Sequence, residues 1–393
     1  MKITKLQKNI PNRWKELKLS DVATKISDGL HTTPKYVEKS NFYFINGNNL
    51  VNDEILIGED IKCVTENEFL KHKKDLSERT ILLSINGTIG SVALYNNENV
   101  ILGKSTAYIN CSNDVNKKYI FNLIKTSNIK KYFEREVTGS TIKNLSIKSI
   151  KNLNFNCPNI LEQNRIVSVL EIWDKSIENL NKKIEIKKQI KKGLMQDLLT
   201  GKKRLSGFKD QWELIKLKTI CNIQKGRQLN KENMLEDGIY PALNGGIEIS
   251  GWTNNWNTKE NTITISEGGN SCGYINFNKE KFWCGGHCYA LNPNKDTDNL
   301  FLYQILKIRQ DKIMTLRVGS GLPNIQKKSL DDLKILFPKS KEEQIAISDI
   351  LTTADREITE LEKKLSIIKD QKKFLLNNLI TGVIRTPENL SIK

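Results

Sequence analysis

Val-Thr-Gly-Ser-Thr-Ile-Lys-Asn-Leu at 137–145 decides the fold, because Arg-Val-Gly-Ser-Gly-Leu-Pro-Asn-Ile at 317–325 echoes it later in the chain. The residues that recur 180 positions later are Gly139, Ser140, Asn144, Ser149, Leu153 and Pro158. After one inserted residue the match continues, pairing Glu162-Gln163 with Glu343-Gln344 and Thr200-Gly201 with Thr381-Gly382. Self-similarity over this length indicates an internal duplication.

Each copy of the repeat ends in a long segment whose apolar residues recur at steps of three and four. This spacing predicts a helix of about 40 residues, roughly 60 Å long, with a coiled-coil seam. The seam residues are Ile166, Leu170, Trp173, Ile177, Leu180 and Ile184 in the first helix and Ile347, Leu351, Ile358, Leu361, Leu365 and Ile368 in the second. Gly201 and Gly382 follow the last apolar positions, where a helix commonly ends. We expect the two helices to pair antiparallel with each other, and pairing between two chains is the alternative.

Three lysines interrupt the apolar seam: Lys187 and Lys191 in the first helix and Lys372 in the second. A charge on a seam predicts that the packing loosens there or opens towards another partner.

Outside the helices, each half of the chain begins alike, Trp-Lys-Glu-Leu-Lys-Leu from Trp14 and Trp-Glu-Leu-Ile-Lys-Leu from Trp212. The residues that follow alternate or run apolar, as strands do. The predicted strands are 80–84, 92–95 and 106–110 in the first half and 262–266, 273–277 and 288–291 in the second. A helical stretch comes next in each half, over 115–135 and 300–316. The fold class is therefore α+β, with two globules, each followed by a long helix.

The chain has 393 residues and a net charge of +17, with the excess mostly in its first half. Such an excess favours a polyanionic partner, because binding phosphates releases condensed counterions. Lysine-rich surfaces without a nucleic-acid role are the other interpretation. The first residues have no apolar signal-peptide core, and no run of about 18 apolar residues could span a bilayer. We expect a cytoplasmic protein whose seven cysteines are reduced and fit no disulfide framework.

The sequence offers no complete catalytic motif. Gly-Lys-Ser at 103–105 resembles the end of a phosphate loop, but Glu98 stands where the first glycine is required. No Asn-Pro-Pro-Tyr or Asp-Pro-Pro-Tyr element for amino-methylation is present. Cys272, Cys284, His287 and Cys288 are zinc-type ligands, but the matching first-half segment has no such residues and adjacent strand residues point to opposite faces. We therefore expect neither a catalytic residue nor a metal on this chain.

Polar loops rich in Gly, Asn and Lys remain as candidates for DNA contacts. Asn and Gln side chains can bond adenine, Arg and Lys can bond guanine, and glycines let the backbone approach the groove. The candidate DNA-binding residues are His31, Thr32, Thr33, Lys35, Tyr36, Asn46, Asn48, Asn86, Thr88 and Lys104 in the first globule and Lys225, Arg227, Gln228, Asn244, Asn270, Ser271 and His287 in the second. Plain turns are the competing interpretation of each loop.

Two different α+β globules, each ending in a copy of one long helix, resemble the specificity subunit of type I restriction-modification systems. The Thr-Gly-Ser-Thr and Gly-Ser-Gly-Leu-Pro-Asn elements, the Glu-Gln helix openings and the Thr-Gly closings carry this resemblance across essentially the whole chain. The Asp-Gly-Leu-His-Thr-Thr-Pro-Lys-Tyr element at 28–36 is also similar to the family's recognition domains.

The resemblance implies target-recognition domains over 1–158 and 205–338, each reading one half of a split, asymmetric site in double-stranded DNA. It implies helical spacers over 159–204 and 339–385, which fix the unread gap and dock two modification (methyltransferase) subunits, with restriction (translocase) subunits added. S-adenosylmethionine, ATP and Mg²⁺ are then expected on those partners, none on this chain, and no membrane is involved.

Three alternatives stay open: a nuclease or methyltransferase acting alone, a coiled-coil scaffold that binds only protein, and an inactivated specificity subunit. The missing catalytic motifs disfavour the first alternative. The net charge and the two polar-loop globules disfavour the scaffold.

Overall fold

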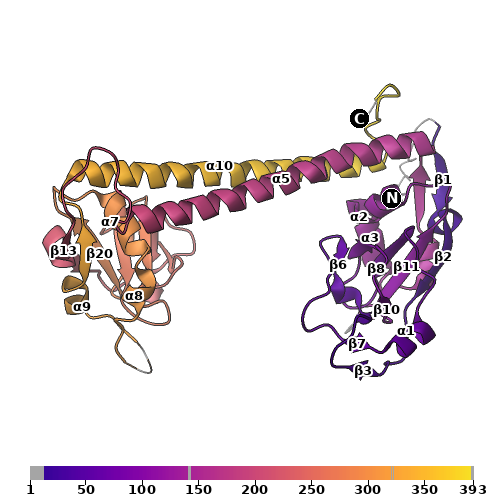
Figure 1. Cartoon of the computed structure of the whole chain (residues 1–393), viewed down its shortest axis with the longest axis horizontal. Helices are drawn as coiled ribbons and strands as arrows, with labels where there is room; N and C mark the ends of the chain where they lie inside the picture. Colours follow the sequence, from indigo (N-terminus) through magenta and orange to yellow (C-terminus); the bar gives the residue numbers. More distant parts are fainter. Residues whose placement is uncertain (1–12, 140–142, 320, 322, 391–393) are drawn as a thin grey trace. The chain divides into compact units, whose positions relative to one another are not determined.

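The computed structural model describes residues 13–139, 143–319, 321 and 323–390 (Figure 1). It divides into two units, which are residues up to Asn179 together with those from Leu365 onward, and residues Leu180–Lys364. The two longest helices, α5 (Ile160–Leu198) and α10 (Lys341–Ile380), each contribute one half to either unit. Each unit is thus an α+β globule with a half of both helices.

The main sheet of the first unit has the strand order β2-β11-β8-β9 and is antiparallel throughout. Its strands are β2 (Ala23–Asp28), β8 (Thr80–Ser84), β9 (Val92–Leu94) and β11 (Thr106–Cys111). Ile81 and Leu83 of β8 join the core under the long helices, whereas Leu82 joins a second core on the other face. Side chains alternate along a strand, so β8 is buried at every position because both faces of the sheet are covered.

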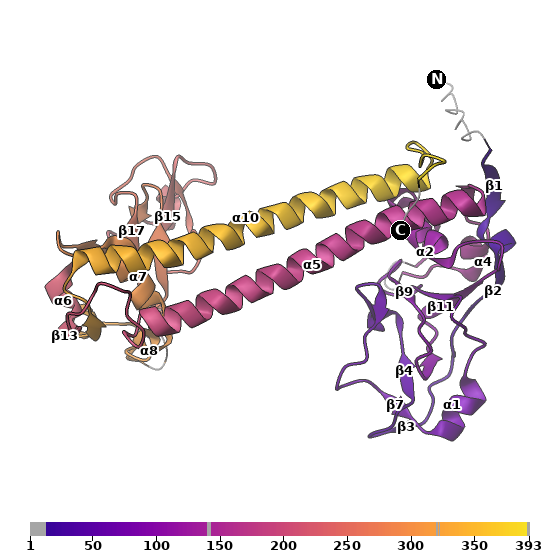
Figure 2. The same cartoon turned by 45° about the horizontal axis from the view of Figure 1, so that its top comes forward.

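Smaller sheets and short helices complete the first unit (Figure 2). Its other strands are β1 (Lys15–Lys18), β3 (Tyr36–Val37), β4 (Tyr43–Ile45), β5 (Leu50–Val51), β6 (Glu54–Ile55), β7 (Cys63–Val64), β10 (Val100–Leu102) and β12 (Asn154–Cys157). Its helices are η1 (Leu19–Val22), η2 (Gly47–Asn49), α1 (Glu66–His72), α2 (Lys117–Lys125), α3 (Ser127–Glu136) and α4 (Ile147–Lys151).

The second unit repeats the main sheet as β14-β20-β17-β18, again antiparallel. Its strands are β13 (Glu213–Lys216), β14 (Cys221–Lys225), β15 (Tyr240–Leu243), β16 (Gly251–Thr253), β17 (Thr262–Ser266), β18 (Ile275–Asn278), β19 (Trp283–Cys284), β20 (Cys288–Pro293) and β21 (Lys334–Phe337). Its helices are α6 (Leu217–Ile220), η3 (Lys231–Asn233), α7 (Asn299–Lys307), α8 (Gln310–Met314) and α9 (Lys327–Asp331).

The predicted strands lie where the sequence places them, within one or two residues, but both predicted helical stretches are broken. Thr126 separates α2 from α3 with an extended backbone, and its hydroxyl donates to the Leu123 carbonyl. The Ser127 amide, freed at the start of α3, donates to the Asn377 side chain at 2.8 Å. The break follows from this tertiary contact and from local capping, which apolar periodicity does not reveal.

The described ends of the duplicated segment pair in the same way in both units. Thr138 and Asn144 exchange backbone hydrogen bonds of 3.0 and 2.9 Å, and Val318 and Asn324 exchange equivalent bonds. Gly139 has a φ of 93° and its counterpart Gly319 a φ of 97°, a region that favours glycine. Ser140 and Ser320, which the repeat also pairs, lie outside the described residues.

The seam predicted for the long helices is the non-exposed side of both α5 and α10. Every seam residue proposed above is buried or half-buried. In the first unit, Ile166 and Leu170 of α5 share a core with Leu376 and Leu379 of α10. In the second, Leu198 shares a core with residues of α10 such as Ile347 and Leu351. The helices therefore pair within the chain in each unit.

Each seam lysine forms an ion pair with a carboxylate of the facing helix. Lys191 pairs with Asp355 in the second unit, and Lys372 pairs with Asp174 in the first. These two pairs are equivalent in the duplication. Lys187 adds a third pair with Glu357 at 2.8 Å. A lysine is tolerated on the seam because the facing helix supplies a carboxylate beside it.

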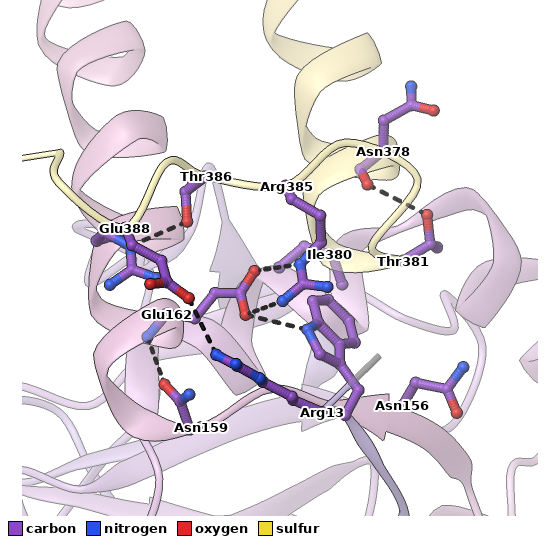
Figure 3. A network of polar contacts seen from close by, with 12 residues as sticks. Arg13, Asn156, Asn159, Glu162, Asn378, Ile380, Thr381, Arg385, Thr386 and Glu388 are labelled. Carbon is purple, nitrogen blue, oxygen red and sulfur yellow. Dashed lines mark hydrogen bonds and ion pairs between the residues drawn. The ribbon is translucent and has the colours of Figure 1, made fainter. Parts of the chain in front are cut away.

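A buried glutamate anchors the start of α5 (Figure 3). The Arg385 guanidinium donates to both carboxylate oxygens of Glu162, at 2.6 and 2.7 Å, and the Trp14 indole donates to one of them at 3.1 Å. The Glu162 side chain is 3% exposed. Its backbone amide donates to the Asn159 side chain, which caps the helix.

The second unit builds the same clamp at the start of α10. Arg204 donates to both oxygens of Glu343, at 2.7 and 2.9 Å, and Trp212 donates to one at 3.3 Å. Each arginine lies just past the end of the long helix that belongs to the other copy of the repeat. The clamps therefore tie the end of one long helix to the start of the other, once in each unit.

The glutamine that follows each clamp glutamate joins the long helix to its globule. Gln163 accepts from the Asn116 amide at 2.8 Å and donates to the Pro158 carbonyl at 2.9 Å. Its counterpart Gln344 accepts from the Asp298 amide at 2.7 Å and donates to a proline carbonyl in the same way. The repeated Glu-Gln dipeptide therefore connects the start of each long helix to its globule.

Thiol reactivity provides a test of this packing, since all seven cysteines are free and buried. Burial raises the pKa of the Cys111 and Cys221 thiols to about 12 and that of Cys157 to about 11. Reaction requires the thiolate, so at pH 8 we expect these three thiols to react with a thiol reagent at least about a hundredfold more slowly in native protein than in urea. Titration with a chromogenic disulfide checks this, and rapid reaction of these thiols in the native state would contradict it.

Candidate nucleic-acid interface

The loops that follow the central strands of the first unit are held by close backbone contacts. At the end of β2, the Gly29 amide donates to the Thr106 carbonyl at 3.0 Å, and the Leu30 amide donates to Leu102 at 2.6 Å. A Cβ atom at Gly29 would lie 2.2 Å from the Leu102 carbonyl oxygen. Only glycine allows this approach, which places the residues after β2 beside the loop at 103–105.

The second unit uses the same framework. At the end of β14, the Gly226 amide donates to Cys288 at 2.8 Å, and the Arg227 amide donates to Cys284 at 2.9 Å. A Cβ atom at Gly226 would lie 2.2 Å from the Gly285 carbonyl oxygen. The two globules therefore hold their polar loops with equivalent hydrogen bonds, whatever side chains the loops carry.

In the first unit, the framework brings four of the candidate DNA-binding residues into one loop cluster: His31, Asn46, Asn86 and Lys104. The Asn46 side chain accepts from the Ser105 hydroxyl at 2.9 Å, and the Asn86 side-chain amide donates to the Lys104 carbonyl at 3.4 Å. His31 lies 2.8 Å from Asp28 at the end of β2. The remaining first-unit candidates are all exposed: Tyr36 begins β3, Asn48 lies in η2, and the others lie in the adjoining loops, namely Thr32, Thr33, Lys35 and Thr88. The Lys62 ammonium lies over the Tyr36 ring, 4.7 Å from the ring centroid.

In the second unit, the candidates gather around the ends of β14, β17 and β20. Lys225 ends β14, Arg227 and Gln228 follow it, and His287 precedes β20. Ser271 donates to the Gly245 carbonyl at 2.9 Å, which joins the loop after β17 to the loop that begins at Asn244. Asn270 is exposed on the same loop.

Sequence reasoning missed the residue that joins these second-unit candidates. The Glu267 carboxylate accepts from Lys225 at 2.7 Å and from the Tyr289 hydroxyl at 2.9 Å, and it lies 3.8 Å from the His287 ring. Its side chain is 12% exposed, whereas that of Lys225 is 53% exposed. An acidic residue is not expected at a DNA interface by charge alone, so only the strand register could have revealed it.

Two absences among the described residues bear on other kinds of site. No three His, Cys, Asp or Glu side chains gather there in a way that could hold a metal ion. Across the same residues, no helix combines the length and the apolar character that crossing a membrane requires.

The sequence matches the family described as "Type I restriction modification DNA specificity domain" over residues 11–188 and 209–369. A type I specificity subunit of Mycoplasma genitalium is 27% identical over 80% of this chain and 84% of its own length. The specificity subunit of the type I restriction enzyme MjaIX of Methanocaldococcus jannaschii is 24% identical over 96% of this chain and 95% of its own.

Solved structures share the fold. The crystal structure of a type I restriction-modification S subunit from M. genitalium has a TM-score of 0.61 at 24% identity, covering 96% of this chain and 98% of that one. A chain from a study of complex assembly in a type I restriction-modification system has a TM-score of 0.62 at 15% identity, covering 95% and 99%. Because the family match covers both halves of the duplication and most of the chain, this protein belongs to the family of type I restriction-modification DNA specificity subunits.

Proposed function

We propose that this specificity subunit reads a split, asymmetric DNA site, with residues 1–158 reading one half and residues 205–338 the other. The observation that carries the proposal is one backbone framework that presents different polar side chains in the two globules. Contacts to phosphates are the same for every sequence, whereas contacts to base edges must differ between half-sites. A duplicated scaffold with divergent loops is what two independent readers require.

The helical regions 159–204 and 339–385 serve as the spacer between the two readers. Helix α5 has 39 residues, about 58 Å at ~1.5 Å per residue. The ion pairs and buried seam residues within each unit support an antiparallel coiled coil with a fixed register. Such a rod spans more than one turn of duplex DNA, roughly 34 Å, and would set the number of unread base pairs.

Exposed apolar side chains on the long helices support docking of methyltransferase subunits. Ile186 on α5 and Ile367 on α10 are equivalent in the duplication and are 55% and 57% exposed. Phe374 and Ile190 extend the exposed apolar surface. Specificity subunits are the non-catalytic component of type I systems. S-adenosylmethionine then belongs to two modification subunits, which methylate adenine. ATP and Mg²⁺ belong to the restriction subunits.

Methylation mapping tests the proposed function. The chain is co-expressed with the methyltransferase subunit encoded beside it in a host free of DNA methylation, and modified adenines are located by long-read sequencing. We expect one split motif with a fixed gap. A soluble complex of the two proteins that modifies no adenine would favour a protein-only scaffold or an inactivated specificity subunit.

A further inference from the structure

Glu267 occupies the position that an isoleucine fills in the first unit. Its amide donates to the His287 carbonyl at 2.9 Å, and its carbonyl accepts from the Ile325 amide at 2.8 Å. Ile85 makes the same two bonds, with Ser105 and Leu145, both at 2.9 Å. The backbone environment is therefore equivalent, and only the side chain has changed from apolar to acidic.

The residues around Glu267 also differ from their counterparts around Ile85 in the first unit. The same register places Asp28, Ala107 and Ser105 where the second unit has Lys225, Tyr289 and His287. Ile85 is 3% exposed and packs into the apolar core of its unit. A carboxylate at this depth requires hydrogen-bond donors, and Lys225 and Tyr289 supply them. These positions form one coupled network whose chemistry distinguishes the two globules.

The network favours a contact with a base over a contact with a phosphate. Glu267 compensates the charge of Lys225, which weakens its attraction to a phosphate. The ammonium retains two further N–H donors and is 53% exposed, so it can still donate to a neutral acceptor. The carboxylate also restricts the rotation of the long lysine side chain, which reduces the entropy lost on binding.

We propose that Glu267 is a positioning residue of the second recognition domain. It fixes the Lys225 ammonium so that this group donates to an acceptor on a base edge of the DNA half-site that the domain reads. The chemistry suits the adjacent O6 and N7 acceptors of guanine in the major groove. This inference rests on the proposed reading of one half-site by residues 205–338.

The test compares methylation motifs of the co-expressed complex for the wild type, Glu267→Gln and Lys225→Met. Glutamine keeps the shape and the acceptor for Tyr289 but loses the ion pair with Lys225. We expect both variants to relax the same base pair in the same half-site, by about tenfold or more in the ratio of preferred to other bases. The other half-site and the gap stay unchanged, and the double variant is no more relaxed than Lys225→Met alone.

Two matched variants separate positioning from folding. Glu267→Asp restores most of the discrimination because it keeps the charge, and Glu260→Gln, an exposed carboxylate in the same domain, matches the wild type. Unchanged stringency in Glu267→Gln would overturn the inference. So would a uniform fall in methylation at all sites accompanied by a lower unfolding temperature, since that is the signature of a merely structural role. A wild-type complex that modifies no split motif fails the proposed function and this inference with it.

Discussion

Replacing Arg204 with Met is expected to lower the free energy of unfolding by about 3–5 kcal/mol. The substitution removes the two guanidinium N–H donors to the Glu343 carboxylate and the Arg204 donor to the Asp210 carbonyl, and leaves the Trp212 donor in place. The Glu343 side chain is 1% exposed, so water cannot replace the lost guanidinium. A buried carboxylate left with only the Trp212 indole is the reason for so large an effect.

Urea unfolding followed by circular dichroism measures the change. The double variant Arg204→Met with Glu343→Gln should recover part of the loss, because a neutral amide is less costly to bury than a charge. Arg13→Met is the matched control, since it breaks an arginine–glutamate pair whose side chains are 73% and 83% exposed. Such surface pairs contribute little. Equal losses in Arg204→Met and Arg13→Met would show that burial of the glutamate does not govern the clamp.

The sequence alone was sufficient to predict the duplication, the long helices and three of the four strands of each main sheet. The predicted strands did not include β2 or β14. The signals of the predicted elements are local or periodic: Ile166 and Leu170 repeat along one helix face, and residues 81–83 are apolar because two cores cover them. The clamps could not be predicted this way. Trp14, Glu162 and Arg385 come from three distant segments, and only the folded chain brings an indole and a guanidinium to one carboxylate.

The candidate interface likewise contains residues that a sequence pattern reveals and residues that only the fold reveals. Gly29 and Gly226 mark loops where only glycine fits, and polar residues around them are a recognisable pattern. Glu267 has no such pattern, because its importance depends on which side chains the register of β14, β17 and β20 places beside it. The ion pairs of the seam lysines were not predicted, for a similar reason. Their partners, Asp355 and Asp174, lie on the facing helix, and heptad spacing does not identify them.

The double substitution of Leu361 and Leu365 by Glu is expected to reduce methylation of the split motif at least about tenfold, or to spread it over several gap lengths. Both leucines are half-buried on the seam of α10. Two carboxylates there must be desolvated or must push the facing helices apart. Because the proposed spacer works only if the register of the helices is fixed, a local loss of packing becomes a loss of defined spacing.

The control places the same two charges on the outer face of α10. Thr359→Glu with Ser366→Glu changes exposed positions seven residues apart, matching the added charge without entering the seam. We expect this variant to methylate the wild-type motif with the wild-type gap. Long-read sequencing of DNA from cells that express each complex measures both quantities. If the seam variant retains the motif, the gap and the wild-type level of methylation, the helices do not act as the spacer, and the gap must be set by the globules or by the methyltransferase subunits instead.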